Sequence, residues 1–127
     1  MSMTAKDLLE EARSRVKSVS PEDASSDATG LILDVREPVE LTSAGSPDGA
    51  LHIARSLLEF KADPAIETHE PRLAQFSDGH AKVHVLCASG GRAALAAATL
   101  VRMGYDATVI EGGMSGWKKA GLDVKPV

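Results

Sequence analysis

VHVLCASGGRAALAAATL, at residues 83–100, joins a β-branched segment to a helix-forming segment through a turn of small residues. The alternating valines over 83–87 favour a buried strand. Alanine and leucine are strong helix formers, so the sequence predicts a helix over 92–103 that Gly104 ends. A strand that passes through a tight turn into a helix is typical of α/β proteins.

Similar short apolar segments occur on both sides of this unit. LILDV at 31–35, ALHIA at 50–54 and ATVI at 107–110 are predicted strands. Short helices are predicted between them at LLEF (57–60) and EPRLAQF (70–76). Parallel strands need crossover connections, which helices normally supply. We therefore predict an α/β fold with a mostly parallel central sheet and helices on both faces.

The N-terminal segment predicts a helix that flanks the domain. Thr4 and Asp7 have the spacing of a capping box, and apolar residues continue at helical spacing to Val19. We expect residues 1–19 to form this helix. A chain of 127 residues is long enough for one domain with one core, which we expect over 20–127.

Composition argues against several classes of function. The net charge of -4 and the aromatic content of 3% provide neither a basic stripe nor a stacking platform for nucleic acid. No apolar run approaches the roughly 20 residues needed to cross a bilayer, and no signal peptide is recognisable, so we expect a cytoplasmic protein without a membrane partner. The single cysteine, Cys87, excludes an intrachain disulfide, and no histidine spacing indicates a metal site.

Cys87 ends the predicted strand and is followed by a turn with two adjacent glycines. Gly90 and Gly91 can adopt backbone angles that other residues avoid, so we expect the amides of 88–92 to turn inward around one point. The start of the next helix adds unpaired N–H groups and the positive end of the helix dipole. These features predict an anion-binding cradle that stabilises a thiolate at Cys87. The alternative is a buried core thiol, which needs no Gly-Gly turn.

Arg92 stands at the far end of this loop with a permanently charged, planar set of donors. It is suited to hold an oxyanion or the sulfite end of a thiosulfonate. Its other predicted role is to close the loop by pairing with a carboxylate.

Three further residues stand near the end of a predicted strand or just after one, at the same edge of the sheet. Asp34 is expected to anchor loops around the site. Arg36 is four residues before Glu40, which predicts a surface ion pair. Arg55 is expected either to add positive potential for an anionic donor or to be a solvated surface residue.

Several segments together resemble the single-domain rhodanese family over nearly the whole chain after residue 20. They are LILDVREPVE, GALHIARSLLEF, the loop CASGGR with its helix, MGYDATVIEGG and GWKKAG. The resemblance implies about five parallel strands and a persulfide on Cys87, within the loop Cys87, Ala88, Ser89, Gly90, Gly91 and Arg92. It also implies a small anionic donor such as thiosulfate, an acceptor such as cyanide, a thiol or a protein thiol, and no metal or organic cofactor.

The length of the loop separates related activities. Four residues lie between Cys87 and Arg92, whereas the related cell-cycle phosphatases and arsenate reductases have five. A shorter ring of amides leaves room for a single outer sulfur rather than a tetrahedral oxyanion. The loop length therefore favours sulfur transfer, and the resemblance implies a rhodanese-type thiosulfate sulfurtransferase. The alternatives are a non-catalytic binding module, which would need no nucleophile, and an enzyme acting on phosphate or arsenate.

The chain departs from the family pattern in two places. It has GSPDGA at 45–50 where many members have GHIPGA, so the conformation of this turn is not predicted by the resemblance. It also has Ala88 where many members have an arginine. Because one positive charge is missing, we predict weaker capture of thiosulfate than an arginine at this position would give.

Overall fold

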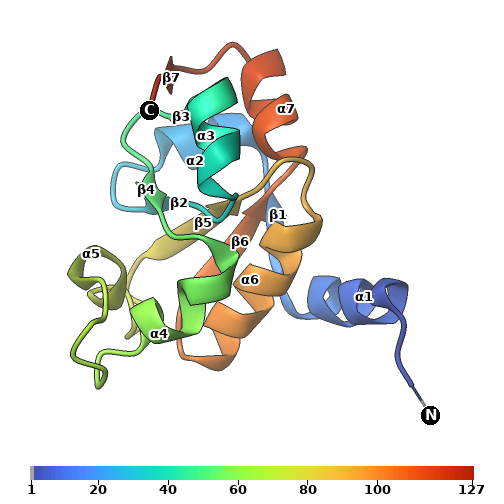
Figure 1. Ribbon diagram of the computed structural model, residues 1–127, viewed down its shortest axis with the longest axis vertical. Coiled ribbons are helices and arrows are strands. Elements are labelled where there is room, and N and C mark those ends of the chain that lie inside the picture. The colour runs from blue at the N-terminus through green and yellow to red at the C-terminus, as the bar shows by residue number, and fades with distance from the viewer. Residues whose placement is uncertain (1) are drawn as a thin grey trace.

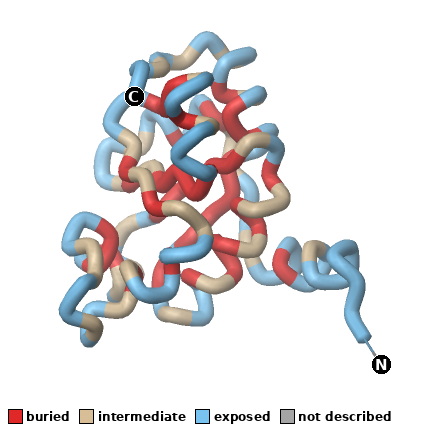
Figure 2. The backbone as a smooth tube through the Cα atoms, in the orientation of Figure 1, coloured by how far each residue is buried: buried red, intermediate tan, exposed pale blue. Residues whose placement is uncertain are grey.

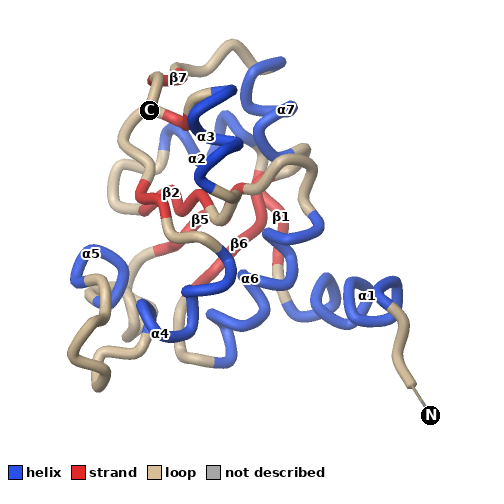
Figure 3. Tube along the Cα trace, viewed as in Figure 1, coloured by secondary structure: helices blue, strands red, loops and turns tan. Residues whose placement is uncertain are grey.

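A five-stranded sheet in which all neighbouring strands are parallel forms the centre of the molecule (Figures 1 and 3). The computed structural model describes residues 2–127. The strand order is β1-β6-β5-β2-β4, with β1 at Lys17–Val19, β2 at Leu31–Asp34, β4 at Leu51–His52, β5 at Lys82–Leu86 and β6 at Asp106–Ile110. The predicted α/β class is confirmed. Because β5 is the middle strand, the residue that follows it lies at the centre of the sheet's carboxyl edge.

Helices cover both faces of the sheet, as predicted. The larger apolar core includes residues of α1 (Ala5–Arg15), α4 (Leu58–Ala62), α5 (Pro71–Ala74) and α6 (Gly91–Arg102). A smaller core on the other face includes residues of α2 (Pro21–Ser26) and α7 (Gly113–Lys119). Side chains alternate between the faces along a strand, so Val85 joins the first core and Leu86 the second. No helix within residues 2–127 is both long and apolar enough to span a bilayer.

Helix α6 packs closely on the middle of the sheet because its inner side is made of alanine. Ala93, Ala96 and Ala97 are fully buried against β5 and β6. Small side chains at a contact let a helix axis approach its neighbour. The first turn of α6 is therefore held at a fixed place relative to the end of β5, and with it the loop between them.

Two shorter elements complete the carboxyl edge of the sheet. Helix α3 (Pro38–Ala44) follows β2, and a single 3-10 turn (Arg55–Leu57) follows β4. Strand β3 (Ser46–Pro47) pairs antiparallel with β7 (Val124–Lys125). The 45–50 turn, whose conformation the resemblance did not predict, thus begins in a small second sheet.

The N-terminal helix is shorter than predicted. The capping box of Thr4 and Asp7 is present, but the helix ends at Arg15, and Lys17–Val19 form the edge strand β1. The carbonyl oxygen of Val19 accepts a hydrogen bond of 2.9 Å from the amide of Glu111, which fixes this strand beside β6. Figure 2 shows that α1 is exposed along most of its length. Only Ala12 in it is buried.

Helix α3 begins at a proline, four residues after the end of β2. Pro38 occupies the first helical position, where its missing N–H costs nothing. Glu37 and Glu40 form a capping box that completes the first turn. This turn places Glu40 at the carboxyl edge of the sheet, near the loop after β5.

Candidate active site

The sulfur of Cys87 lies inside the turn between β5 and α6. The amide of Gly90 donates to Sγ at 3.0 Å, and the amide of Ala93 donates at 3.3 Å. Gly90 is the N-cap of α6 and has φ +118°, a backbone conformation that residues other than glycine rarely adopt. The sulfur therefore occupies the position where a helix N-terminus accepts a negative group.

The start of α6 supplies the electrostatic part of this arrangement. The first backbone bond at its N-terminus runs from Ala94 to Gly90, so the amide of Ala93 has no carbonyl partner within the helix. A helix of twelve residues also directs the positive end of its dipole at the turn. Both effects favour negative charge on the sulfur of Cys87.

The predicted cradle differs in detail from the structure. The amides of 88–92 were expected to converge, but in residues 2–127 the donors to the sulfur are Gly90, inside this range, and Ala93, just beyond it. The thiol is 1% exposed and packs in the larger apolar core. Cys87 is therefore both a buried residue and one whose sulfur accepts main-chain hydrogen bonds.

Helix α7 supports the loop from its outer side. The amide of Met114 donates to the carbonyl oxygen of Cys87 at 2.8 Å. A Cβ atom on Gly113 would lie closer than 3.0 Å to the carbonyl oxygens of Cys87 and Ala88. Gly113 is thus required for this contact. Its only signal in the sequence is its place in the VIEGG segment, to which no role was assigned.

Arg92 is paired with Glu40 by two hydrogen bonds, from Nη1 at 2.6 Å and from Nη2 at 2.9 Å. The hydrogen bond from Arg92 lowers the pKa of Glu40 to about 2. The same bond raises the pKa of Arg92. Of the two roles predicted for Arg92, the structure shows loop closure by a carboxylate. Sequence reasoning missed Glu40 as the partner, because the two residues approach each other only through the tertiary fold.

Asp34 and Arg36 form a buried ion pair at the end of β2. Nε and Nη2 of Arg36 donate to the carboxylate at 3.0 and 2.7 Å, and Nη2 also donates to the carbonyl oxygen of Gly45. The hydroxyl of Ser46 donates to the same carboxylate at 2.8 Å. Asp34 therefore anchors the 45–46 backbone. The predicted surface pair of Arg36 with Glu40 is wrong, because Arg36 folds inward and is only 2% exposed.

Arg55 is held on the flank of α6. Its Nη1 donates to Glu59 at 2.9 Å, and its Nη2 donates to the hydroxyl of Thr99 at 3.4 Å. Thr99 is two turns of helix beyond Gly91. Arg55 is thus neither a free surface residue nor a residue in contact with the sulfur.

A pocket of about 260 Å³ opens beside the loop. It is lined by Arg36, Glu40, Ser43, Ala44, Ala88, Met114, Ser115 and Lys118. Three of its sides come from α3, from the first residue after Cys87 and from α7. In Figure 1 the loop between β5 and α6 passes beside the start of α7. A small molecule in this pocket would lie next to the turn that holds the sulfur.

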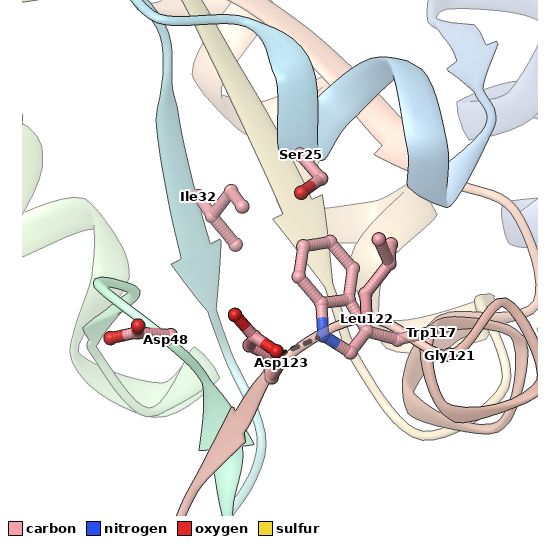
Figure 4. Close-up of a pocket in the computed structure, with 7 residues that line it drawn as sticks. All are labelled: Ser25, Ile32, Asp48, Trp117, Gly121, Leu122 and Asp123. Carbon is pink, nitrogen blue, oxygen red and sulfur yellow. Dashed lines mark hydrogen bonds between the residues drawn. The ribbon is translucent and has the colours of Figure 1, made fainter.

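Another pocket lies among α2, β2 and the segment after α7 (Figure 4). Figure 4 shows the indole nitrogen of Trp117 directed at Asp123, to whose carbonyl oxygen it donates at 3.0 Å. Trp117 is 2% exposed and belongs to the smaller core, so it anchors α7 by packing. Its role is structural.

His84 belongs to a buried network on the face opposite the sulfur. Its ring nitrogens lie 2.8 Å from the carboxylate of Asp27 and 2.7 Å from the hydroxyl of Thr108. The bond with His84 lowers the pKa of Asp27. All polar atoms of the ring have partners, so this histidine is a satisfied core residue.

Comparisons with known proteins agree with this fold. The family model described as Rhodanese-like domain matches residues 18–120. No curated protein sequence matches the chain significantly.

Three solved structures show how far the similarity extends. A protein of unknown function from Rhodopseudomonas palustris, described as a possible tyrosine phosphatase, is 31% identical over 98% of this chain and 96% of its own, with a TM-score of 0.88. The homodimeric polysulfide-sulfur transferase of Wolinella succinogenes is 32% identical over 94% and 85% of the two chains, with a TM-score of 0.71. A rhodanese-related protein from Thermoplasma volcanium is 28% identical over 87% and 99%, with a TM-score of 0.68.

Proposed function

The chain belongs to the rhodanese-like domain family, and from this premise we propose that it is a sulfurtransferase that carries sulfane sulfur as a persulfide on Cys87. The observation that supports this most is the pair of amides, from Gly90 and Ala93, that donate to Sγ at the start of α6. A thiolate is the reactive form of cysteine, and main-chain donors at a helix N-terminus stabilise it. The Wolinella protein, similar over nearly the whole chain, is described as a sulfur transferase.

In the first half of the reaction, the Cys87 thiolate attacks the outer sulfur of a donor such as thiosulfate. A new S–S bond forms between Sγ and that sulfur, while the S–S bond of thiosulfate breaks and its electron pair leaves with sulfite. One thiolate and one thiosulfate dianion give one persulfide anion and one sulfite dianion, so charge and atoms balance. The amides of Gly90 and Ala93 donate to Sγ, so they stabilise the thiolate that makes the attack.

In the second half, an acceptor attacks the outer sulfur of the persulfide. Cyanide forms thiocyanate, and a thiolate forms its own persulfide, while the bonding electron pair returns to Sγ and restores the thiolate. Neither step uses a metal or an organic cofactor. A free cysteine suits a compartment that keeps thiols reduced, so we propose that the protein is cytoplasmic.

Phosphatase activity is the competing reaction, because a similar protein is described as a possible tyrosine phosphatase. A loop arginine that holds a phosphate must offer its two parallel donors to the phosphate oxygens. In this structure both terminal nitrogens of Arg92 are taken by Glu40. This pairing, together with the short loop, favours sulfur transfer.

A steady-state assay with thiosulfate and cyanide tests the proposal. We expect thiocyanate formation with parallel double-reciprocal lines, the signature of a ping-pong mechanism. Cys87→Ser should abolish it without unfolding the protein. An aryl phosphate assay runs in parallel: phosphate release that depends on Cys87 would identify an oxyanion enzyme instead. A folded wild-type protein inactive in both assays would indicate a non-catalytic module.

A further inference from the structure

The proposed reaction brings two negative groups together. The arginines near the loop do little to offset the repulsion between them. Thiosulfate carries two negative charges and must approach a thiolate. The charge of Arg92 is balanced by Glu40, and that of Arg36 is balanced by Asp34. Both pairs are bidentate or nearly so, which is the strong form of an arginine–carboxylate contact. An anionic donor therefore needs a positive charge from another residue.

Lys118 supplies such a charge at the pocket beside the loop. It lines the pocket, is exposed, and forms no ion pair with any residue within 2–127. Lys118 follows Met114 by four residues on α7, so both side chains lie on the same side of the helix. The amide of Met114 contacts the carbonyl oxygen of Cys87. The ammonium group of Lys118 therefore lies one helical turn beyond the point where α7 contacts the loop after β5.

The rest of the pocket is small and has both apolar and polar walls. Ala44, Ala88 and Met114 give it apolar walls, while Ser43 and Ser115 place hydroxyl groups among them. Arg36 also lines it, and the structure shows no hydrogen bond from its Nη1 to another residue within 2–127. One donor nitrogen of a buried guanidinium and one exposed ammonium are therefore left for a ligand.

We propose that Lys118 is a specificity-determining residue, whose ammonium group binds the sulfur donor and makes this pocket favour the dianion thiosulfate over donors with less negative charge, such as the organic thiosulfonates. The inference rests on the proposed function, since it assigns a donor-binding residue to the same site. The ammonium group attracts the departing oxyanion end, while the outer sulfur points to Cys87. Its effect is on capture of the donor, because the charge lies away from the S–S bond that breaks. It replaces the arginine that position 88 lacks.

The test compares Lys118→Gln with Lys119→Gln as the matched control. Lys119 is the next residue on α7, is exposed, and does not line the pocket. We expect Lys118→Gln to lower kcat/KM for thiosulfate by about two- to fivefold through KM, the range of one exposed charge pair. The loss should be smaller for methanethiosulfonate, which carries one negative charge, and should vanish at high salt. Equal kcat/KM values for the two variants, or an equal loss of kcat/KM for both donors in Lys118→Gln, would overturn the proposal.

A second readout does not depend on sulfur transfer. Iodoacetate and iodoacetamide both alkylate a thiolate and differ by one negative charge, so their rate ratio at Cys87 reports the local potential. We expect Lys118→Gln to lower the iodoacetate-to-iodoacetamide ratio about two- to fivefold, and Lys119→Gln to leave it unchanged. If no sulfur transfer occurs but the ratio falls, the proposed function fails and the charge of Lys118 still acts at the thiol. An unchanged ratio, or a thiol that neither reagent reaches, contradicts the assignment.

Discussion

Glu40 and Arg92 are 52 residues apart in the chain, and two hydrogen bonds of 2.6 and 2.9 Å connect their side chains. The pair joins the first turn of α3 to the first turn of α6, the two helices that follow neighbouring strands β2 and β5. It fixes the far end of the loop that begins at Cys87. It also removes Arg92 from the groups that are free to bind an anion.

This ion pair predicts a pH-dependent contribution to stability. The pKa of Glu40 falls from its ordinary value of 4.5 to about 2, so the pair stabilises the fold fully above about pH 4.5 and loses its effect as the pH falls towards 2. Both side chains are about one third exposed, which limits the effect to about 1 kcal/mol. Urea unfolding of Glu40→Gln should show this loss at pH 7 and a smaller one at pH 3. The same difference at both pH values would contradict the account.

The buried pair of Asp34 and Arg36 should matter much more for folding. Asp34→Asn leaves the guanidinium of Arg36 buried without a counter-charge, which costs about 3–5 kcal/mol. Asp106→Asn removes the exposed pair with Lys82 and should cost at most about 1 kcal/mol. Denaturant unfolding of both variants measures the contrast. Similar losses would show that Asp34 does not anchor the 45–46 backbone.

Gly113 should be irreplaceable because of its contact with the loop. It has φ +55°, and a Cβ atom there would overlap the carbonyl oxygens of Cys87 and Ala88. Gly121 has φ +73°, but a Cβ atom there would meet open space. Gly121→Ala should therefore lower the free energy of unfolding by about 1–2 kcal/mol through its backbone conformation alone. Gly113→Ala should lower the free energy of unfolding clearly more, and it should also lower the rate of sulfur transfer. Equal effects on stability would argue against the predicted overlap.

The strands and helices that carry the loop were predictable because their sequence patterns are local. The valines before Cys87 and the alanines after Arg92 specify a strand and a helix by themselves. Strand β1 was missed because Val16 and Val19 fit helical spacing as well as a strand. Only pairing with β6 decides between the two, and that depends on residues far away in the chain.

The partners of the loop were less predictable than the loop itself. Cys87, Gly90 and Arg92 are close in sequence, so their proximity follows from the turn. Glu40 and Lys118 come from α3 and α7, and no spacing in the sequence relates them to Cys87. Arg36 was assigned the wrong carboxylate because Glu40 has helical spacing, whereas Asp34 becomes its partner through burial.

Ala88→Arg should improve thiosulfate capture. Ala88 lines the pocket together with Met114 and Glu40 and directly follows Cys87, so an arginine there adds a positive charge near the sulfur. We expect KM for thiosulfate to fall by about two- to fivefold, and the gain to shrink at high salt. Steady-state kinetics at two ionic strengths measure this. An unchanged or higher KM would show that charge at position 88 does not control capture.

The central claim is that Cys87 accepts a sulfur atom within the turn that starts α6. Intact mass spectrometry after incubation with thiosulfate tests it most directly. We predict a mass increase of one sulfur atom that cyanide or a thiol removes, and no increase in Cys87→Ala. A wild-type protein that gains no sulfur, or a Cys87→Ala variant that still gains it, would contradict the account.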